Sequence, residues 1–159
     1  MPNLSQKISK NAEETRQFGA KLGQLLPKNT ILALTGDLGG GKTTFTQGLA
    51  WGLGVSQLVT SPTFVLAKTF PLKKPGYRYL YHLDLYRLAK KQIDQRVLAE
   101  QFSDEKSIMV IEWAAKIKNW LPDDKTIWLN FNYRGNDQRQ ITHQTVNFTL
   151  DKIVKIAYN

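Results

Sequence analysis

The sequence contains no cysteine, and none of its apolar runs approaches the roughly 18 residues needed to span a membrane. The lack of cysteine excludes disulfides and thiolate metal sites. Residues 1–10 lack the apolar core of a signal peptide, so we expect a soluble, cytoplasmic protein. Repeats, low-complexity segments and linkers are also missing. We therefore expect a single domain over residues 1–159, a length sufficient for one buried core.

Acidic residues are few relative to basic ones, with 13 Asp and Glu against 22 Lys and Arg and a net charge of +9. This excess of positive charge favours phosphorylated or nucleic-acid partners. A generally basic surface without such a partner is an equally good explanation. The basic residues are scattered, and no run of five like charges marks a tail. Charge alone therefore predicts no RNA-binding site.

The strongest motif is the glycine-rich segment 36–43, GDLGGGKT, which fits the phosphate-binding pattern G-x-x-x-x-G-K-[ST]. Glycines allow the backbone to turn several N–H groups toward an anion. Lys42 would place a positive charge on the β- and γ-phosphates of a nucleotide. Thr43 would offer its hydroxyl to a magnesium ion. The segment therefore predicts a nucleotide site.

The segments that flank this motif agree with it. The unbroken apolar run 31–34 is typical of a strand buried on both faces. The pattern over 43–53 predicts a helix with its N-terminus toward the phosphates and one apolar face, formed by Phe45, Leu49 and Leu53. Gly48 and Gly52 lie four apart in this helix, and we expect them to allow close packing against a neighbouring strand.

A second apolar run, 108–111, ends in the carboxylate of Glu112. Ligands in open α/β sheets bind at the carboxyl ends of parallel strands, so we expect Glu112 to hold magnesium directly or through water. An ordinary carboxylate at a strand end is the alternative. The strand predicted over 77–84 also ends in an acid, Asp84, which shares one face with His82. We interpret these two as a solvated or sheet-lining pair.

The loop 60–64 lies between the predicted helix and the next strand. Its hydroxyl groups include Ser61 and Thr63, and Pro62 makes it rigid. We expect such groups to sense the γ-phosphate, as switch loops do, although a plain loop would have the same sequence.

The other predicted elements follow from periodicity and capping residues. Asn11 and Glu14 predict the start of a helix, and Pro27 its end. We further expect helices over 94–102 and 114–120, a short edge strand at 7–9, and strands over 63–70, 127–133 and 140–150. The last two strands would form a hairpin that extends the sheet antiparallel.

Four stretches follow one another along the sequence: 36–44 (GDLGGGKTT), 61–64 (SPTF), 82–88 (HLDLYRL) and 111–113 (IEW). Together they resemble the bacterial TsaE (YjeE-like) ATPases. These proteins take part in making threonylcarbamoyladenosine next to the anticodon of tRNAs that read codons beginning with A. The resemblance covers about residues 8–150, and the last two stretches are its most diagnostic part.

The resemblance implies an α/β fold, a P-loop NTPase-like three-layer sandwich whose mixed sheet gains antiparallel strands at its C-terminal end. It implies ATP or ADP with Mg²⁺ as cofactors, and TsaD and TsaB as partners. Any tRNA would be reached through that complex, and no membrane is involved. The ATPase activity would reset the partner complex. Gly40 departs from the family, in which alanine is commoner, and we expect it to loosen the loop slightly.

The resemblance also implies roles for single residues. Thr43 and Glu112 would hold magnesium. Lys42, Asp84, Glu112 and Trp113 are expected at the reacting phosphate. We add Thr63, a hydroxyl of the loop 60–64. The nucleotide would be bound by Asp37, Leu38, Gly39, Gly40, Gly41, Lys42, Thr43 and Thr44, with weaker correspondence at Glu14, Thr15 and Arg139.

Other functions share a phosphate loop. The sequence has no Asn-Lys-x-Asp motif, which argues against a GTPase. A small-molecule kinase would close an arginine-bearing lid, and only Arg87 and Arg96 lie in a suitable region. A protein that binds TsaB–TsaD with ATP as a structural ligand, and does not hydrolyse it, is the alternative from another class.

Overall fold

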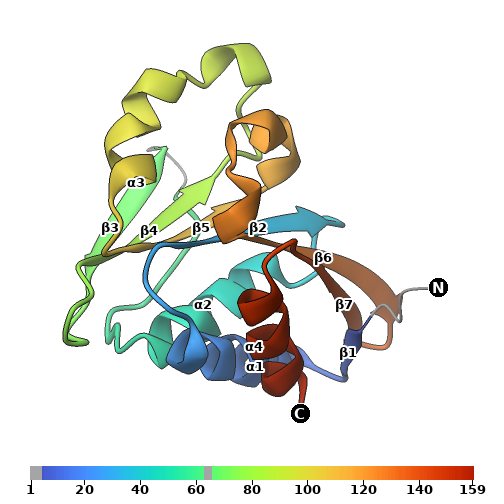
Figure 1. Cartoon of the computed structure of the whole chain (residues 1–159). Helices are drawn as coiled ribbons and strands as arrows, with labels where there is room; N and C mark the ends of the chain where they lie inside the picture. Colours follow the sequence, from blue (N-terminus) through green and yellow to red (C-terminus); the bar gives the residue numbers. More distant parts are fainter. Residues whose placement is uncertain (1–4, 63–65) are drawn as a thin grey trace.

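The structure is a computed structural model that describes residues 5–62 and 66–159 (Figure 1). Its seven-stranded sheet has the order β1-β7-β6-β2-β5-β4-β3. The strands are β1 (Gln6–Ser9), β2 (Thr30–Gly36), β3 (Ala67–Pro71), β4 (Tyr79–Asp84), β5 (Ile108–Glu112), β6 (Thr126–Gly135) and β7 (Gln138–Gln144). The α-helices are α1 (Ala12–Leu25), α2 (Lys42–Gly52), α3 (Ala99–Ser103) and α4 (Phe148–Tyr158).

The sheet is mixed, as predicted. Strand β2 lies at its centre and runs parallel to β5 and β6, and β4 runs parallel to β5. The outer strands β1, β3 and β7 pair antiparallel. The expectation that the whole late hairpin joins antiparallel is wrong for β6. The 3-10 helices η3 (Ala114–Trp120) and η4 (Asp123–Lys125) connect the end of β5 to the start of β6. This crossover returns the chain to the edge of the sheet where β2 and β5 begin, so β6 runs parallel to β2.

The helices cover both faces of the sheet and complete three layers (Figure 1). Helices α1, α2 and α4 pack on one face, and α3 and η3 lie on the other. The run 31–34 serves both, because Leu32 and Leu34 enter the first core while Ile31 and Ala33 enter the second. This explains why the run is apolar throughout. In the part of the chain that the structure describes, no helix is both long and apolar enough to cross a membrane.

The predicted strand 140–150 is wrong beyond Gln144, where α4 begins at Phe148. The Asn147 side chain accepts hydrogen bonds from the amides of Thr149 and Leu150, which caps this helix. Alternation of apolar residues suggested a strand, yet Phe148 is 70% exposed. The periodicity that matters is helical and buries Leu150, Val154 and Ala157.

Smaller differences concern element ends and helix type. The predicted helix 94–102 is a 3-10 helix, η2 (Gln95–Leu98), followed by α3, and 114–120 is 3-10 with a kink at Ile117. Strand β3 starts at Ala67, and residues 63–65 of the predicted strand lie outside the described residues.

Glycines bring α1 and α2 into backbone contact. A Cβ at Gly48 would overlap the carbonyl of Arg16, and one at Gly52 would overlap the carbonyl of Ala20. Both neighbours belong to α1, so the expectation of a neighbouring strand is wrong. Sequence periodicity locates these glycines on a helix but does not say which element lies opposite. The contact fixes α2, and therefore the phosphate loop in front of it, against the N-terminal helix.

We predict that Gly48→Ala lowers the free energy of unfolding by about 1–3 kcal/mol, the usual cost of overpacking. Helix propensity alone would raise it by about 1 kcal/mol, so the sign of the change is diagnostic. Urea denaturation measures it. Gln17→Ala, at an exposed position of α1, is the control and should stay within about 0.5 kcal/mol. A Gly48→Ala variant as stable as the parent chain would contradict the backbone contact.

Candidate functional site

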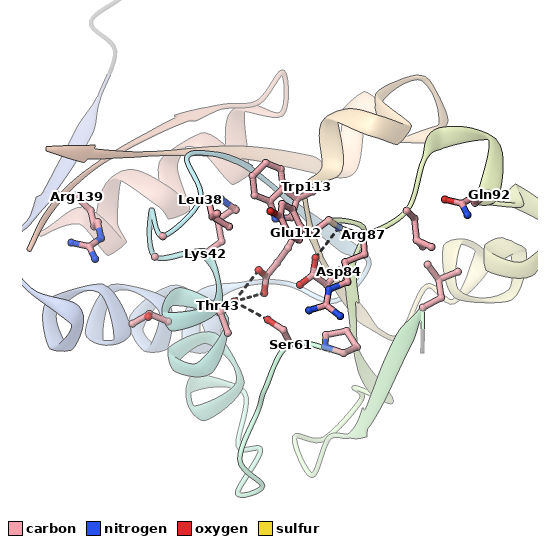
Figure 2. A pocket seen from close by; sticks show the side chains of 17 residues that line it. Leu38, Lys42, Thr43, Ser61, Asp84, Arg87, Gln92, Glu112, Trp113 and Arg139 are labelled. Carbon is pink, nitrogen blue, oxygen red and sulfur yellow. Dashed lines mark hydrogen bonds between the residues drawn. The ribbon is translucent and has the colours of Figure 1, made fainter. Parts of the chain in front are cut away.

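Three parallel strands end together at one edge of the sheet. Their register pairs Glu112 with Leu34 on one side and with Asp84 on the other. A cavity of about 550 Å³ opens over this edge, a volume in the usual range for small-molecule sites (Figure 2). It is lined by Leu38, Gly39, Gly41, Lys42, Thr43, Thr44, Ser61, Pro62, Leu66, Asp84, Tyr86, Arg87, Leu88, Gln92, Glu112, Trp113 and Arg139.

The phosphate loop takes its shape from contacts with β6. Gly36 has a φ of 113°, and a side chain there would overlap the backbone of Phe131. The amide of Asp37 donates to the Phe131 carbonyl at 3.0 Å, and the Asp37 carboxylate accepts from the Tyr133 amide at 3.1 Å. A Cβ at Gly40 would lie 2.9 Å from the carbonyl oxygens of both Asp37 and Phe131. Gly40 therefore permits a close contact, which the expectation of a loosened loop did not include.

Lys42 is the buried cation of the site. Its Nζ donates to the carbonyls of Gly36 at 3.0 Å and Asp37 at 2.6 Å, and lies 4.3 Å from the centroid of the Trp113 ring. Burial lowers the pKa of this ammonium group, while the carboxylate of Glu112 acts in the opposite direction. Within residues 5–62 and 66–159, Lys42 forms no salt bridge, so its charge is available to an anion.

Thr43 and Glu112 meet at the first turn of α2. The Thr43 hydroxyl lies 3.0 Å from Glu112 Oε2, 3.3 Å from Oε1 and 3.0 Å from the Ser61 hydroxyl (Figure 2). Glu112 is only 2% exposed. On its other side, His82 Nε2 lies 2.9 Å from Glu112 Oε1. The two predicted metal ligands are therefore adjacent, and a buried histidine contacts one of them.

The far wall of the cavity is held together by one lysine. Lys116 Nζ donates to the carbonyls of Leu85 (2.6 Å), Tyr86 (2.8 Å) and Leu88 (2.7 Å), the loop that follows Asp84. The Tyr86 ring also packs against that of Trp113, with centroids 4.9 Å apart. Trp113 adopts left-handed backbone angles, which cost a non-glycine residue about 1–2 kcal/mol. Such strain is concentrated at functional sites.

The opposite end of the cavity carries a second free cation, Arg139 on β7. Its guanidinium lies 4.8 Å from the Tyr133 ring centroid, and its Nε lies 3.6 Å from where a Cβ of Gly41 would be. Nothing among the described residues accepts a hydrogen bond from its buried Nε and Nη1. Thr15 lies behind the loop, and its hydroxyl is engaged by Ser9 at 2.6 Å.

Most residues predicted for the site line the cavity. Four do not: Thr15 lies behind the loop, Gly40 packs against β6, the Asp37 carboxylate is turned to β6, and the Glu14 carboxylate accepts from the Lys10 amide. Thr63 lies outside the described residues. The sequence analysis did not assign the contact between His82 and Glu112, nor the role of Lys116. The alternation in β4 placed His82 on the face of Asp84, which was the available signal, whereas no local pattern marks Lys116.

The residues present fit a nucleotide with magnesium. Among the described residues, Lys42 forms no salt bridge and the buried Nε and Nη1 of Arg139 have no acceptor, so both side chains call for an anion along the loop. Thr43 and Glu112 offer the hard oxygen donors that Mg²⁺ prefers. In the described part of the chain, no three His, Asp or Glu side chains gather into a metal site of their own. Magnesium is commonly bound by only one or two protein carboxylates, and the phosphates of the substrate supply further ligands.

Comparisons with known proteins assign the chain to a family and agree with its fold. The family model described as "Threonylcarbamoyl adenosine biosynthesis protein TsaE" matches residues 9–141. The tRNA threonylcarbamoyladenosine biosynthesis protein TsaE of Bacillus subtilis is 35% identical over 86% of this chain and 82% of its own. That of Treponema pallidum is 34% identical over 85% and 96%. The crystal structure of Bacillus subtilis YdiB superposes with a TM-score of 0.76 at 32% identity, covering 99% of this chain and 95% of that one.

We predict that Lys42→Ala weakens ATP binding by about a hundred- to several-thousandfold, because it leaves buried phosphate charge without its partner. Isothermal titration with ATP and magnesium measures this. Lys118→Ala removes an exposed lysine outside the cavity and serves as the control. Unchanged affinity in the Lys42 variant would remove the basis for a phosphate site at this loop.

Proposed function

Since the chain belongs to the TsaE family of threonylcarbamoyladenosine biosynthesis proteins, we propose that it is a magnesium-dependent ATPase. We further propose that it hydrolyses ATP in complex with TsaB and TsaD during tRNA modification. The observation that carries the proposal is the contact of Thr43 with Glu112 beside the buried charge of Lys42. These three side chains suit a nucleoside triphosphate with magnesium better than an uncharged ligand.

Each group has a distinct role in the proposed reaction. Lys42 binds the β- and γ-phosphates, and its contact with the Trp113 ring keeps the charge in place. Thr43 and Glu112 would hold the magnesium ion, which supplies positive charge for the phosphoryl oxygens. Asp84, fixed by the Tyr86 amide at 3.0 Å, faces the same cavity and orients groups near the terminal phosphate. Catalysis of this kind rests on positioning and electrostatics.

Partner dependence is supported by how few cations line the cavity: among the described residues these are Lys42, Arg87 and Arg139. Arg139 lies at the opposite end of the cavity from Gln92 (Figure 2). Arg87 is exposed, so it is available to a partner as well as to a ligand. Phosphoryl transfer gains strongly from an additional positive group. We therefore propose that the TsaB–TsaD complex completes the site, and that Ser61 and Trp113 report the nucleotide state to it.

We predict that Glu112→Gln lowers magnesium-dependent ATP hydrolysis by about 100-fold or more, since metal charge stabilisation is worth several kcal/mol. The amide keeps the shape of the side chain but not the charge that attracts magnesium. Nucleotide affinity measured in EDTA should change little. Glu105→Gln, at an exposed carboxylate, is the control. Hydrolysis at the parent rate would assign Glu112 a structural role and make Asp84 the candidate ligand.

We predict that the isolated chain releases phosphate slowly and that adding TsaB and TsaD raises the rate by about a thousandfold or more. Trp113→Ala should reduce this stimulation. Trp51→Ala removes a tryptophan that is 58% exposed on α2, outside the cavity, and should not. Steady-state phosphate release, with and without the partners, measures both.

The same measurement separates the alternatives. An isolated chain that already works at ordinary enzyme rates and gains nothing from the partners contradicts the partner dependence. Transfer of labelled phosphate to a small acceptor would indicate a kinase. ATP-dependent assembly with TsaB and TsaD without phosphate release would indicate a non-hydrolysing binding protein.

A further inference from the structure

We propose that His82 is a positioning residue, whose Nε2–H holds the Glu112 carboxylate in the orientation that binds magnesium. The inference rests on the proposed function, because it concerns the metal site of the same cavity. His82 lies in the middle of β4 and is completely buried, and its Nε2 is 2.9 Å from Glu112 Oε1. It does not line the cavity, so it acts on a ligand only through Glu112.

The surroundings of the imidazole select one tautomer. Nδ1 is buried and has no hydrogen-bond partner among the described residues. A proton on Nδ1 would therefore be a buried donor without an acceptor, and it would leave the Nε2 lone pair facing a carboxylate oxygen. A proton on Nε2 instead makes a hydrogen bond to Glu112 and leaves only the Nδ1 lone pair unmatched. The geometry assigns the proton to Nε2, where it is donated to the Glu112 carboxylate.

The hydrogen bond from His82 differs from the other hydrogen bonds of Glu112. In the described part of the chain, the Glu112 side chain is hydrogen-bonded by Thr43 and His82 alone. Thr43 is itself a proposed metal ligand, so its hydroxyl oxygen is also needed by the ion. His82 is the contact that does not belong to the ligand set. Groups in this position commonly orient metal ligands, and their loss costs about 10- to 100-fold in metal affinity.

Two variants separate positioning from simple core packing. His82→Leu keeps an apolar side chain of moderate size but removes the donor. His82→Gln keeps an amide N–H at the end of a chain that reaches a similar distance. His143→Gln is the control, because His143 is the other histidine of the sequence and is also buried and 2.8 Å from a carboxylate, that of Asp151. It lies on β7, outside the cavity.

The first measurement is ATP binding at increasing magnesium concentration and, separately, in EDTA. We expect His82→Leu to raise the half-saturating magnesium concentration by about 10-fold or more, as for the loss of other groups that orient metal ligands. Its metal-free ATP affinity should change less than about twofold, because His82 does not touch the cavity. His82→Gln should recover most of the loss, and His143→Gln should change neither quantity. An unchanged magnesium requirement in His82→Leu overturns the proposal, and so does a Gln variant as impaired as the Leu variant.

The second measurement needs no substitution at His82. Long-range ¹H–¹⁵N spectra of the uniformly labelled chain report the tautomer of each imidazole, and the His143→Gln spectrum identifies the signals of His82. The expected result is a ring that carries its proton on Nε2. A ring protonated at Nδ1 overturns the proposal even if His82→Leu fails to fold. A chain that binds ATP and magnesium but hydrolyses nothing would defeat the proposed ATPase and leave both measurements able to decide the role of His82.

Discussion

The structure depends on burying one carboxylate. Glu112 is 2% exposed, and a buried charge is costly unless donors compensate it. Its donors come from two different elements, Thr43 at the start of α2 and His82 on β4. They reach it because β2, β5 and β4 run parallel and in register, so that the ends of these strands meet at one edge. The strand order of the sheet therefore brings together the hydrogen-bond donors that the buried Glu112 carboxylate needs.

What could be predicted from the sequence was mostly local. The glycine loop, the strand before it, the helix after it and the acid at the end of β5 are each specified by adjacent residues, and the structure has these elements where they were expected. The three-layer α/β fold and the family followed from such stretches and are confirmed. Roles at the reacting phosphate remain predictions, since a fold positions residues without testing their chemistry.

What could not be predicted depends on which elements meet. Nothing in β4 alone shows that His82 faces Glu112, because that contact requires the register between two strands. The partner of Gly48 was likewise misjudged, since a glycine marks a close approach without naming the neighbour. In α4 two patterns competed, and the cap at Asn147 with a helical apolar face prevailed over a short alternation. Lys116 carries no signal, because its acceptors are backbone carbonyls distant in sequence.

The dependence of the phosphate loop on β6 has a consequence for synthesis of the protein. Gly36 and Asp37 are shaped by contacts with Phe131 and Tyr133, which are translated long after them. A growing chain therefore contains the whole phosphate motif while it still lacks the strand that gives the motif its form. Since a domain folds as a unit, the loop takes its final form only after β6 has been made. The segment that carries the motif is therefore complete well before it has the shape that the folded domain gives it.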